Sequence, residues 1–256
     1  MKHLLRTTFL LLVISSCKND TSGNYPVEKP VWDIADYESI TQEILYGTPD
    51  GEKFPTMAEN PEVFSKLIDK NNIAQVLDDE SLGLNYRHEY AEKLFNIWRS
   101  LLDGYSIKDR QDKFVYPLEV VKLRDWGYFI QIKYFKLGND AIRKDAVDPQ
   151  DPGVQRIIGE NKQAVINNFI NGITLLTDED ALTDEAVEEY SVILKSNYTT
   201  LIETFKGANY GEMAETINDI LKKVKSESVK QSLSEIKALI DTTKNTEAAN
   251  TGNTTL

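Results

Sequence analysis

His88 and Glu92 come nearest, by type and spacing, to metal-binding or proton-transfer chemistry in this sequence. They lie one helical turn apart in the segment HEYAE, so on a helix their side chains share one face and could approach one ion. The chain has only two His and one Cys, which excludes zinc sites built from several such ligands. We interpret the pair as a surface His beside a Glu, and a metal site is the alternative.

Two groups of acidic residues raise the question of Ca²⁺ binding. The first contains Asp145, Asp148 and Asp151, and the second is the segment 177–185, TDEDALTDE. Neither group has the Asp-x-Asp-x-Asp-Gly spacing, with a Glu at position twelve, that folds an EF-hand loop around the ion. We interpret both as solvated helix termini, and no cofactor is predicted.

Arg124, Gln131 and Trp126 are the candidate ligand-binding residues. If residues 118–137 form a helix, Arg124 and Gln131 project from its apolar face, where a guanidinium needs a counter-charge. That partner is either an internal carboxylate, which we favour, or an external ligand. Trp126, with Trp32 and Trp98, could line a sugar-binding cleft, although Trp98 falls on an apolar helical face and is expected in the core.

The segment 114–137 has two interpretations. It is rich in β-branched and aromatic residues, and a β-hairpin turning at 125–127 would explain the alternation from Tyr128 to Tyr134. We favour a central helix, because its charged residues fall along one line at 100° per residue. These residues are Glu119, Lys122, Asp125, Lys133, Lys136 and Asp140.

The rest of the body has the apolar period of helices. This period is found in segments 90–102, 165–176, 187–205, 213–224 and 229–240. Helix starts are predicted at Asn60-Pro61-Glu62 and at Thr183. A short connection at 225–227 suits an antiparallel helical pair. The sequence therefore predicts an all-α, multi-helix bundle over residues 32–240.

The two flanks of this body differ from it in composition. Residues 17–31 contain Gly and two Pro among few apolar residues, which is typical of a flexible tether. Residues 241–256, DTTKNTEAANTGNTTL, are polar and low in complexity, and they predict a disordered tail.

The first seventeen residues are typical of a secretory signal. A basic head precedes the apolar run Phe9–Ile14, which is shorter than the about 20 residues of a membrane-spanning helix. The following Ile14-Ser15-Ser16-Cys17 resembles the lipobox of bacterial lipoproteins. The resemblance implies that residues 1–16 are removed and that Cys17 receives acyl chains such as palmitate, which anchor the protein to a membrane.

The residues after Cys17 indicate to which membrane the lipoprotein would be delivered. In many lipoproteins an Asp at this position favours retention in the inner membrane, and here the residue is Lys18. The resemblance therefore implies the outer membrane. Lys18-Asn19-Asp20 also resembles the export signals of Bacteroidota-type surface lipoproteins, so both the periplasmic and the cell-surface face remain open.

The charge balance restricts the partners. The chain has 41 acidic and 29 basic residues, a net charge of −12, and loss of residues 1–16 removes Lys2 and Arg6 and brings it to −14. Such a chain is not expected to bind nucleic acid.

No catalytic residue is assigned from the sequence. We expect a non-enzymatic binding or scaffolding component of an envelope protein complex, with partners among envelope or outer-membrane proteins. The alternatives are a small-ligand or glycan-binding lipoprotein and a carboxylate-dependent surface hydrolase.

Overall fold

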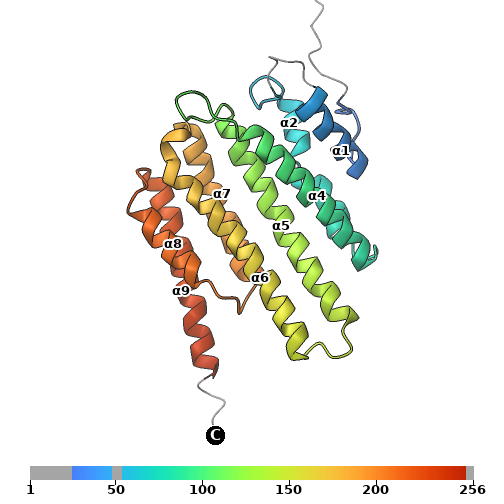
Figure 1. Cartoon of the computed structure of the whole chain (residues 1–256), viewed down its shortest axis with the longest axis vertical. Coiled ribbons are helices and arrows are strands. Elements are labelled where there is room, and N and C mark those ends of the chain that lie inside the picture. The colour runs from blue at the N-terminus through green and yellow to red at the C-terminus, as the bar shows by residue number, and fades with distance from the viewer. Residues whose placement is uncertain (1–24, 48–53, 252–256) are drawn as a thin grey trace, which may run out of the picture.

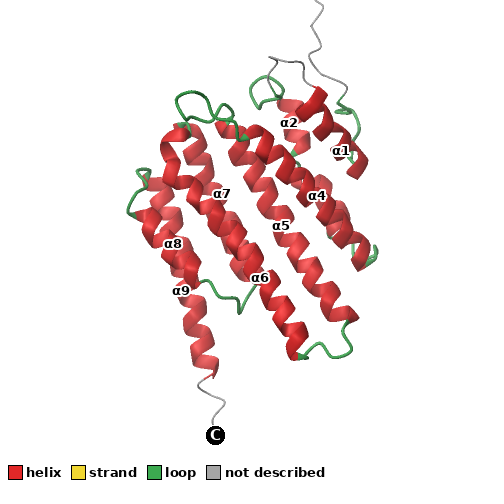
Figure 2. Cartoon of the chain, in the orientation of Figure 1, coloured by secondary structure: helices red, strands yellow, loops and turns green. Residues whose placement is uncertain are grey.

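The computed structural model of the chain describes residues 25–47 and 54–251. Its regular structure is helical (Figure 2), and helix makes up 75% of the described residues. Within the described residues there is no strand, only an isolated antiparallel bridge between Lys108 and Phe114. The predicted all-α, multi-helix bundle is confirmed.

The elements follow one another with short connections. They are α1 (Ile34–Gln42), a π-helical turn (Glu43–Gly47), α2 (Pro61–Leu67), α3 (Lys70–Leu77), α4 (Leu84–Tyr105), α5 (Pro117–Asp145), α6 (Pro152–Ile173), a 3₁₀ segment (Thr174–Ala181), α7 (Asp184–Thr204), α8 (Gly211–Leu221) and α9 (Glu227–Thr251).

Side-chain caps and prolines set where several helices begin. Asp33, Asp69, Asp151 and Thr183 each accept a hydrogen bond from a backbone N–H of the first turn. Proline stands at the start of α2, α5 and α6, where its missing N–H costs no helical hydrogen bond. The predicted start after Asn60 is correct, but the Asn60 side chain makes no capping hydrogen bond.

The helix α5 passes through the middle of the bundle, with α4 on one side and α6 and α7 on the other (Figure 1). It contains 29 residues and continues eight residues beyond the predicted segment 114–137. The hairpin alternative is wrong, because the proposed turn at 125–127 lies inside this helix. Residues 114–116 precede the helix, which begins at Pro117.

Two hydrophobic clusters lie on different faces of α5. The N-terminal cluster joins α1–α4 to one face through side chains such as Tyr37, Leu101 and Trp126. The C-terminal cluster joins α6–α9 to another face through Tyr128 and Phe169 among others. Because α5 contributes to both clusters, its position sets the relation between the two halves of the bundle.

The predicted polar line of α5 is largely confirmed, with one correction. Lys122 pairs with Glu189, and Asp125 accepts hydrogen bonds from Lys70 and Asn197, so these charges join α5 to α3 and α7. Glu119 is only 6% exposed, although the line predicts it in solvent. Its carboxylate accepts a hydrogen bond of 2.8 Å from the backbone N–H of Met57, which offsets the loss of hydration.

The C-terminal helices form the predicted pair. The helix α8 ends at Leu221 and α9 begins at Glu227, and α9 packs along both α7 and α8. The connection is held by Glu179, whose carboxylate accepts hydrogen bonds from the backbone N–H groups of Lys225 and Ser226 at 2.7 and 3.0 Å.

Both flanks differ from the expected boundaries where the structure describes them. Within the expected tether, Tyr25 packs against the N-terminal cluster, and the carbonyl of Pro26 accepts a hydrogen bond from the Trp32 indole at 2.9 Å. At the other end α9 continues to Thr251, beyond the boundary at residue 240. The signal sequence, Cys17 and residues 18–24 lie outside the described residues.

A helix that crosses a bilayer needs about 20 mostly apolar residues. No helix within residues 25–47 and 54–251 is both long and apolar enough to do so.

Candidate functional site

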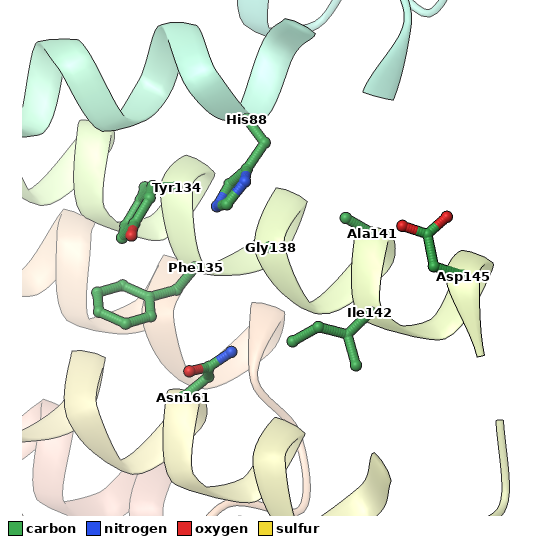
Figure 3. Close-up of a pocket in the computed structure, with 8 residues that line it drawn as sticks. All are labelled: His88, Tyr134, Phe135, Gly138, Ala141, Ile142, Asp145 and Asn161. Atoms are coloured by element: carbon green, nitrogen blue, oxygen red, sulfur yellow. The ribbon is translucent and has the colours of Figure 1, made fainter. Parts of the chain in front are cut away.

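A cleft of about 340 Å³ opens between the first turns of α4, the end of α5 and the middle of α6 (Figure 3). We call it the His88 cleft. Its lining combines rings and aliphatic groups with three polar side chains, and consists of His88, Tyr134, Phe135, Gly138, Ala141, Ile142, Asp145 and Asn161.

The His88 ring is held in place by aromatic stacking between α4 and α5. It lies nearly parallel to the Tyr134 ring, with centroids 5.0 Å apart and planes at 9°. Tyr134 in turn lies parallel to Phe95, with centroids at 5.4 Å and planes at 13°. Burial, with a smaller contribution from the Glu92 carboxylate, raises the pKa of Tyr134, so its phenol stays neutral at physiological pH.

A glycine allows this approach of the two helices. A Cβ atom added to Gly138 would lie 3.0 Å from Nε2 of His88, closer than side chains normally come. With no side chain at this position, the imidazole reaches the backbone of α5 and forms one wall of the cleft.

His88 lines the cleft, but Glu92, its neighbour one helical turn along α4, does not. Glu92 is exposed and is not among the cleft residues, whereas the carboxylate of Asp145 is. No group of three or more His, Cys, Asp or Glu side chains suited to a metal ion occurs in the described part of the chain. His88 therefore shares the cleft with Asp145 at the end of α5 rather than with Glu92 of its own helix.

The acidic groups around the α5–α6 connection form its turns. Asp148 accepts a hydrogen bond from the backbone of Gln150, and Asp151 accepts them from Gly153 and Val154 at the start of α6. Carboxylates at these positions are favoured by the positive end of the helix. In the second acidic group, Asp180 pairs with Lys225.

The internal carboxylate expected for Arg124 is not found among the described residues, and the external ligand stays a prediction. Within the described residues its guanidinium forms no ion pair, and its Nε atom is buried without a hydrogen bond. Its positive charge lies near the hydroxyls of Tyr190 and Tyr198 and opposes the large rise in their pKa that burial causes. Arg124 thus lies at the edge of the C-terminal cluster, outside the His88 cleft.

Gln131 is 1% exposed, and its Oε1 atom has no hydrogen-bond partner among the described residues. It belongs to a line on α5 that recurs every seven residues: Arg124, Gln131, Gly138 and Asp145. Seven residues are nearly two helical turns, so these positions lie one above another. The last two line the cleft. This spacing of seven is the sequence signal for the cleft, and Gly138 conceals it because it has no side chain.

The three Trp residues belong to the core. Trp126 is fully buried and stacks on Tyr37 with ring centroids 5.7 Å apart, and Trp32 is 1% exposed. Trp98 is 8% exposed, as its apolar position predicts, and its indole donates a hydrogen bond to the carbonyl of Leu123. Trp126 lies about 200° around α5 from Arg124, so the structure separates it from the other two candidate ligand contacts.

The His88 cleft can recognise a group with an apolar body and a polar end. Tyr134, Phe135 and Ile142 offer apolar walls, and Asp145 offers an acceptor at the rim. Asn161 and the His88 ring add further hydrogen-bonding atoms. A few polar groups that converge on an apolar recess are typical of binding sites.

Comparison with known proteins gave no relative. No family description, curated protein or solved structure matches the chain.

Proposed function

We propose that this chain is a non-enzymatic lipoprotein of the outer membrane that binds a protein partner in the cell envelope, and that the His88 cleft receives a side chain of that partner. The anchor is Cys17 in the lipobox-like sequence, and the helical bundle is the binding module.

The position of the cleft relative to the anchored end carries this proposal. The described chain starts at Tyr25, which is close enough to Tyr105 at the end of α4 to affect its pKa. His88 lies seventeen residues back along α4, or about 26 Å at 1.5 Å per residue. The anchored end of the chain therefore joins the bundle about 26 Å along α4 from the cleft, which leaves the cleft open to a partner.

The size of the cleft favours one side chain over a whole small molecule. At about 340 Å³ it lies at the lower end of the range for ligand pockets. Protein interfaces concentrate their binding energy in a few anchor side chains that fill such recesses. The apolar walls and the Asp145 acceptor suit a Trp, Tyr or Arg side chain, each of which has an apolar body and a donor at its end.

An exposed apolar side chain next to the cleft supports a protein partner. Val147, two residues after Asp145 in the connection from α5 to α6, is fully exposed. It would belong to the surrounding contact surface that excludes water from a central anchor.

Site-specific photo-crosslinking in intact cells tests the proposal. A benzoylphenylalanine at Val147 should capture discrete envelope proteins, whereas the same probe at Tyr46, which is 81% exposed in the turn after α1, is the matched control and should not. Ala141→Trp fills the cleft from its lining and should abolish the Val147 products. Products that are equal at both positions, or that persist with Ala141→Trp, would contradict the assignment of the cleft.

A further inference from the structure

A second cleft, of about 350 Å³, lies on the other side of α5 from the His88 cleft. We call it the basic cleft. Three elements contribute to it: α5, α6 and the end of α7 with the residues after it. Its lining consists of Lys136, Asn139, Asp140, Arg143, Lys162, Glu203, Thr204, Phe205 and Lys206.

The charge of this cleft is opposite to that of the molecule. Four cationic side chains and two carboxylates line it, which leaves a charge of +2 in a chain whose net charge is −12. Lys136 and Arg143 share a single carboxylate, that of Asp140, at 2.7 and 3.1 Å. One acid therefore serves two cations, and most of the five guanidinium donors of Arg143 remain available.

The cations are brought together by the fold. Lys136 and Arg143 lie seven residues apart on one face of α5. Lys162 of α6 donates a hydrogen bond of 3.1 Å to the backbone carbonyl of Lys206, which holds the segment after α7 against α6. This contact places the Lys206 residue at the same cleft, 63 residues along the chain from Arg143.

A buried amide adds an independent observation. Asn139 lines the basic cleft and is 2% exposed. Its Oδ1 atom accepts a hydrogen bond of 3.1 Å from Asn161, and its Nδ2 atom makes none among the hydrogen bonds of the described residues. This amide donor, in the wall of a cationic cleft, is available to an acceptor supplied from outside.

We propose that the basic cleft binds a phosphate monoester group. Such a group carries a charge of about −1.5 to −2 at pH 7, which matches the +2 of the lining, and its three oxygens can accept from a guanidinium, an ammonium and an amide together. Arg143 supplies the fork that fits two phosphate oxygens, Lys136, Lys162 and Lys206 supply point charges, and Asn139 Nδ2 supplies the neutral donor. The proposal goes beyond the proposed function, because it concerns a different cleft and a different ligand.

Equilibrium dialysis of the full chain in a non-ionic detergent against radiolabelled inorganic phosphate tests it. Ionic strength is held constant with chloride at pH 7. One equivalent of phosphate should bind saturably, with half-saturation below about 10 mM. The double variant Arg143→Gln/Lys206→Gln should weaken binding by about tenfold or more, since charge-assisted hydrogen bonds are lost.

The matched control is Lys222→Gln/Lys230→Gln. It removes two positive charges that pair with Asp219 and Glu227 near α8 and α9, and phosphate binding should change by less than about twofold. Non-saturable binding to the unmodified chain, or an equal loss in both double variants, would overturn the proposal. This experiment measures phosphate binding and not partner crosslinking. A negative result here therefore leaves the proposed function untouched.

Competition distinguishes two sources of the phosphate group. Glycerol 3-phosphate and water-soluble dihexanoyl phosphatidic acid are each added against labelled phosphate. Equal competition assigns the site to a free phosphate ester, and at least about tenfold stronger competition by the lipid assigns it to a phospholipid headgroup. Competition by neither one would overturn the monoester assignment.

Discussion

Asn161 donates a hydrogen bond of 3.1 Å to Asn139 Oδ1, and this pair stands between the two clefts of the bundle. Asn161 lines the His88 cleft, and Asn139 lines the basic cleft. A change at either cleft can therefore reach the other through one hydrogen bond between α5 and α6.

The contact between α4 and α5 gives a first prediction. A Cβ atom at Gly127 would lie 2.0 Å from Nε1 of Trp98, whose indole is fixed by its hydrogen bond to Leu123. Gly127→Ala should therefore lower the free energy of unfolding by about 1–3 kcal/mol or more through overpacking. Urea denaturation measures this change.

Gly159→Ala is the control for that substitution. Gly159 lies within α6, and an added Cβ atom would meet nothing within 4 Å. The substitution should raise the free energy of unfolding by about 0.5–1 kcal/mol, because alanine loses less backbone entropy on folding. Equal effects at the two positions would contradict the close packing of α5 on Trp98.

Tyr90 gives a prediction about alkaline pH. Burial raises its pKa to about 12 in the folded chain, with smaller contributions from Tyr86, Asp33 and Asp36, whereas a phenol in the unfolded chain titrates near 10. Between pH values of about 10 and 12 the Tyr90 phenol has lost its proton in the unfolded chain but keeps it in the folded chain. Stability should therefore not depend on this group below about pH 10 and should fall above it.

Tyr90→Phe should reduce the slope of that alkaline decline. At pH 7 it should leave stability unchanged or raise it by up to about 1 kcal/mol, because the Tyr90 hydroxyl is buried without a hydrogen-bond partner. Thermal melts from pH 8 to 12 provide the comparison. Tyr46→Phe removes a hydroxyl from an 81% exposed side chain and should leave the decline as it is.

Arg124 can be replaced with little loss of stability. No carboxylate of the described residues pairs with it, so Arg124→Leu leaves no buried acid uncompensated. The free energy of unfolding should stay unchanged or rise by about 1 kcal/mol in chemical denaturation. A loss of about 3–5 kcal/mol would instead mean that an internal carboxylate depends on this guanidinium. Arg99→Leu, at an exposed position of α4, controls for the added leucine.

The lipid anchor is tested by Cys17→Ala. The variant should lose acyl labelling and leave the membrane fraction, because the sole Cys of the chain is then absent. Membrane fractions and metabolic labelling with a palmitate analogue measure the two effects. A processed protein that stays on the membrane without Cys17 would refute the lipobox assignment.

The helices themselves were predictable from the sequence for local reasons. An apolar period of 3.6, a capping side chain such as Thr183 and a proline such as Pro117 act within a few residues of where they stand. The line of charged residues on α5 also predicted the polar positions of Lys122 and Asp125 correctly. Such a line distinguishes a helix from a hairpin by the spacing of residues within the segment alone.

The partners of each face were decided only by the tertiary structure. Periodicity shows that one side of a helix is apolar, but it does not show which distant segment covers it. Trp126 is buried because Tyr37 packs on it, and Glu119 is buried because the backbone of Met57 satisfies its carboxylate.

The candidate sites depend on the same long-range packing. His88 and Asp145 line one cleft although 57 residues of sequence separate them, and Arg143 and Lys206 line the other across 63 residues. The sequence by itself determined the helices, the net charge and the lipobox-like signal, since these need only neighbouring residues or a sum over the chain. Folding decided which side chains share a cleft, since that depends on how α5 packs between α4, α6 and α7.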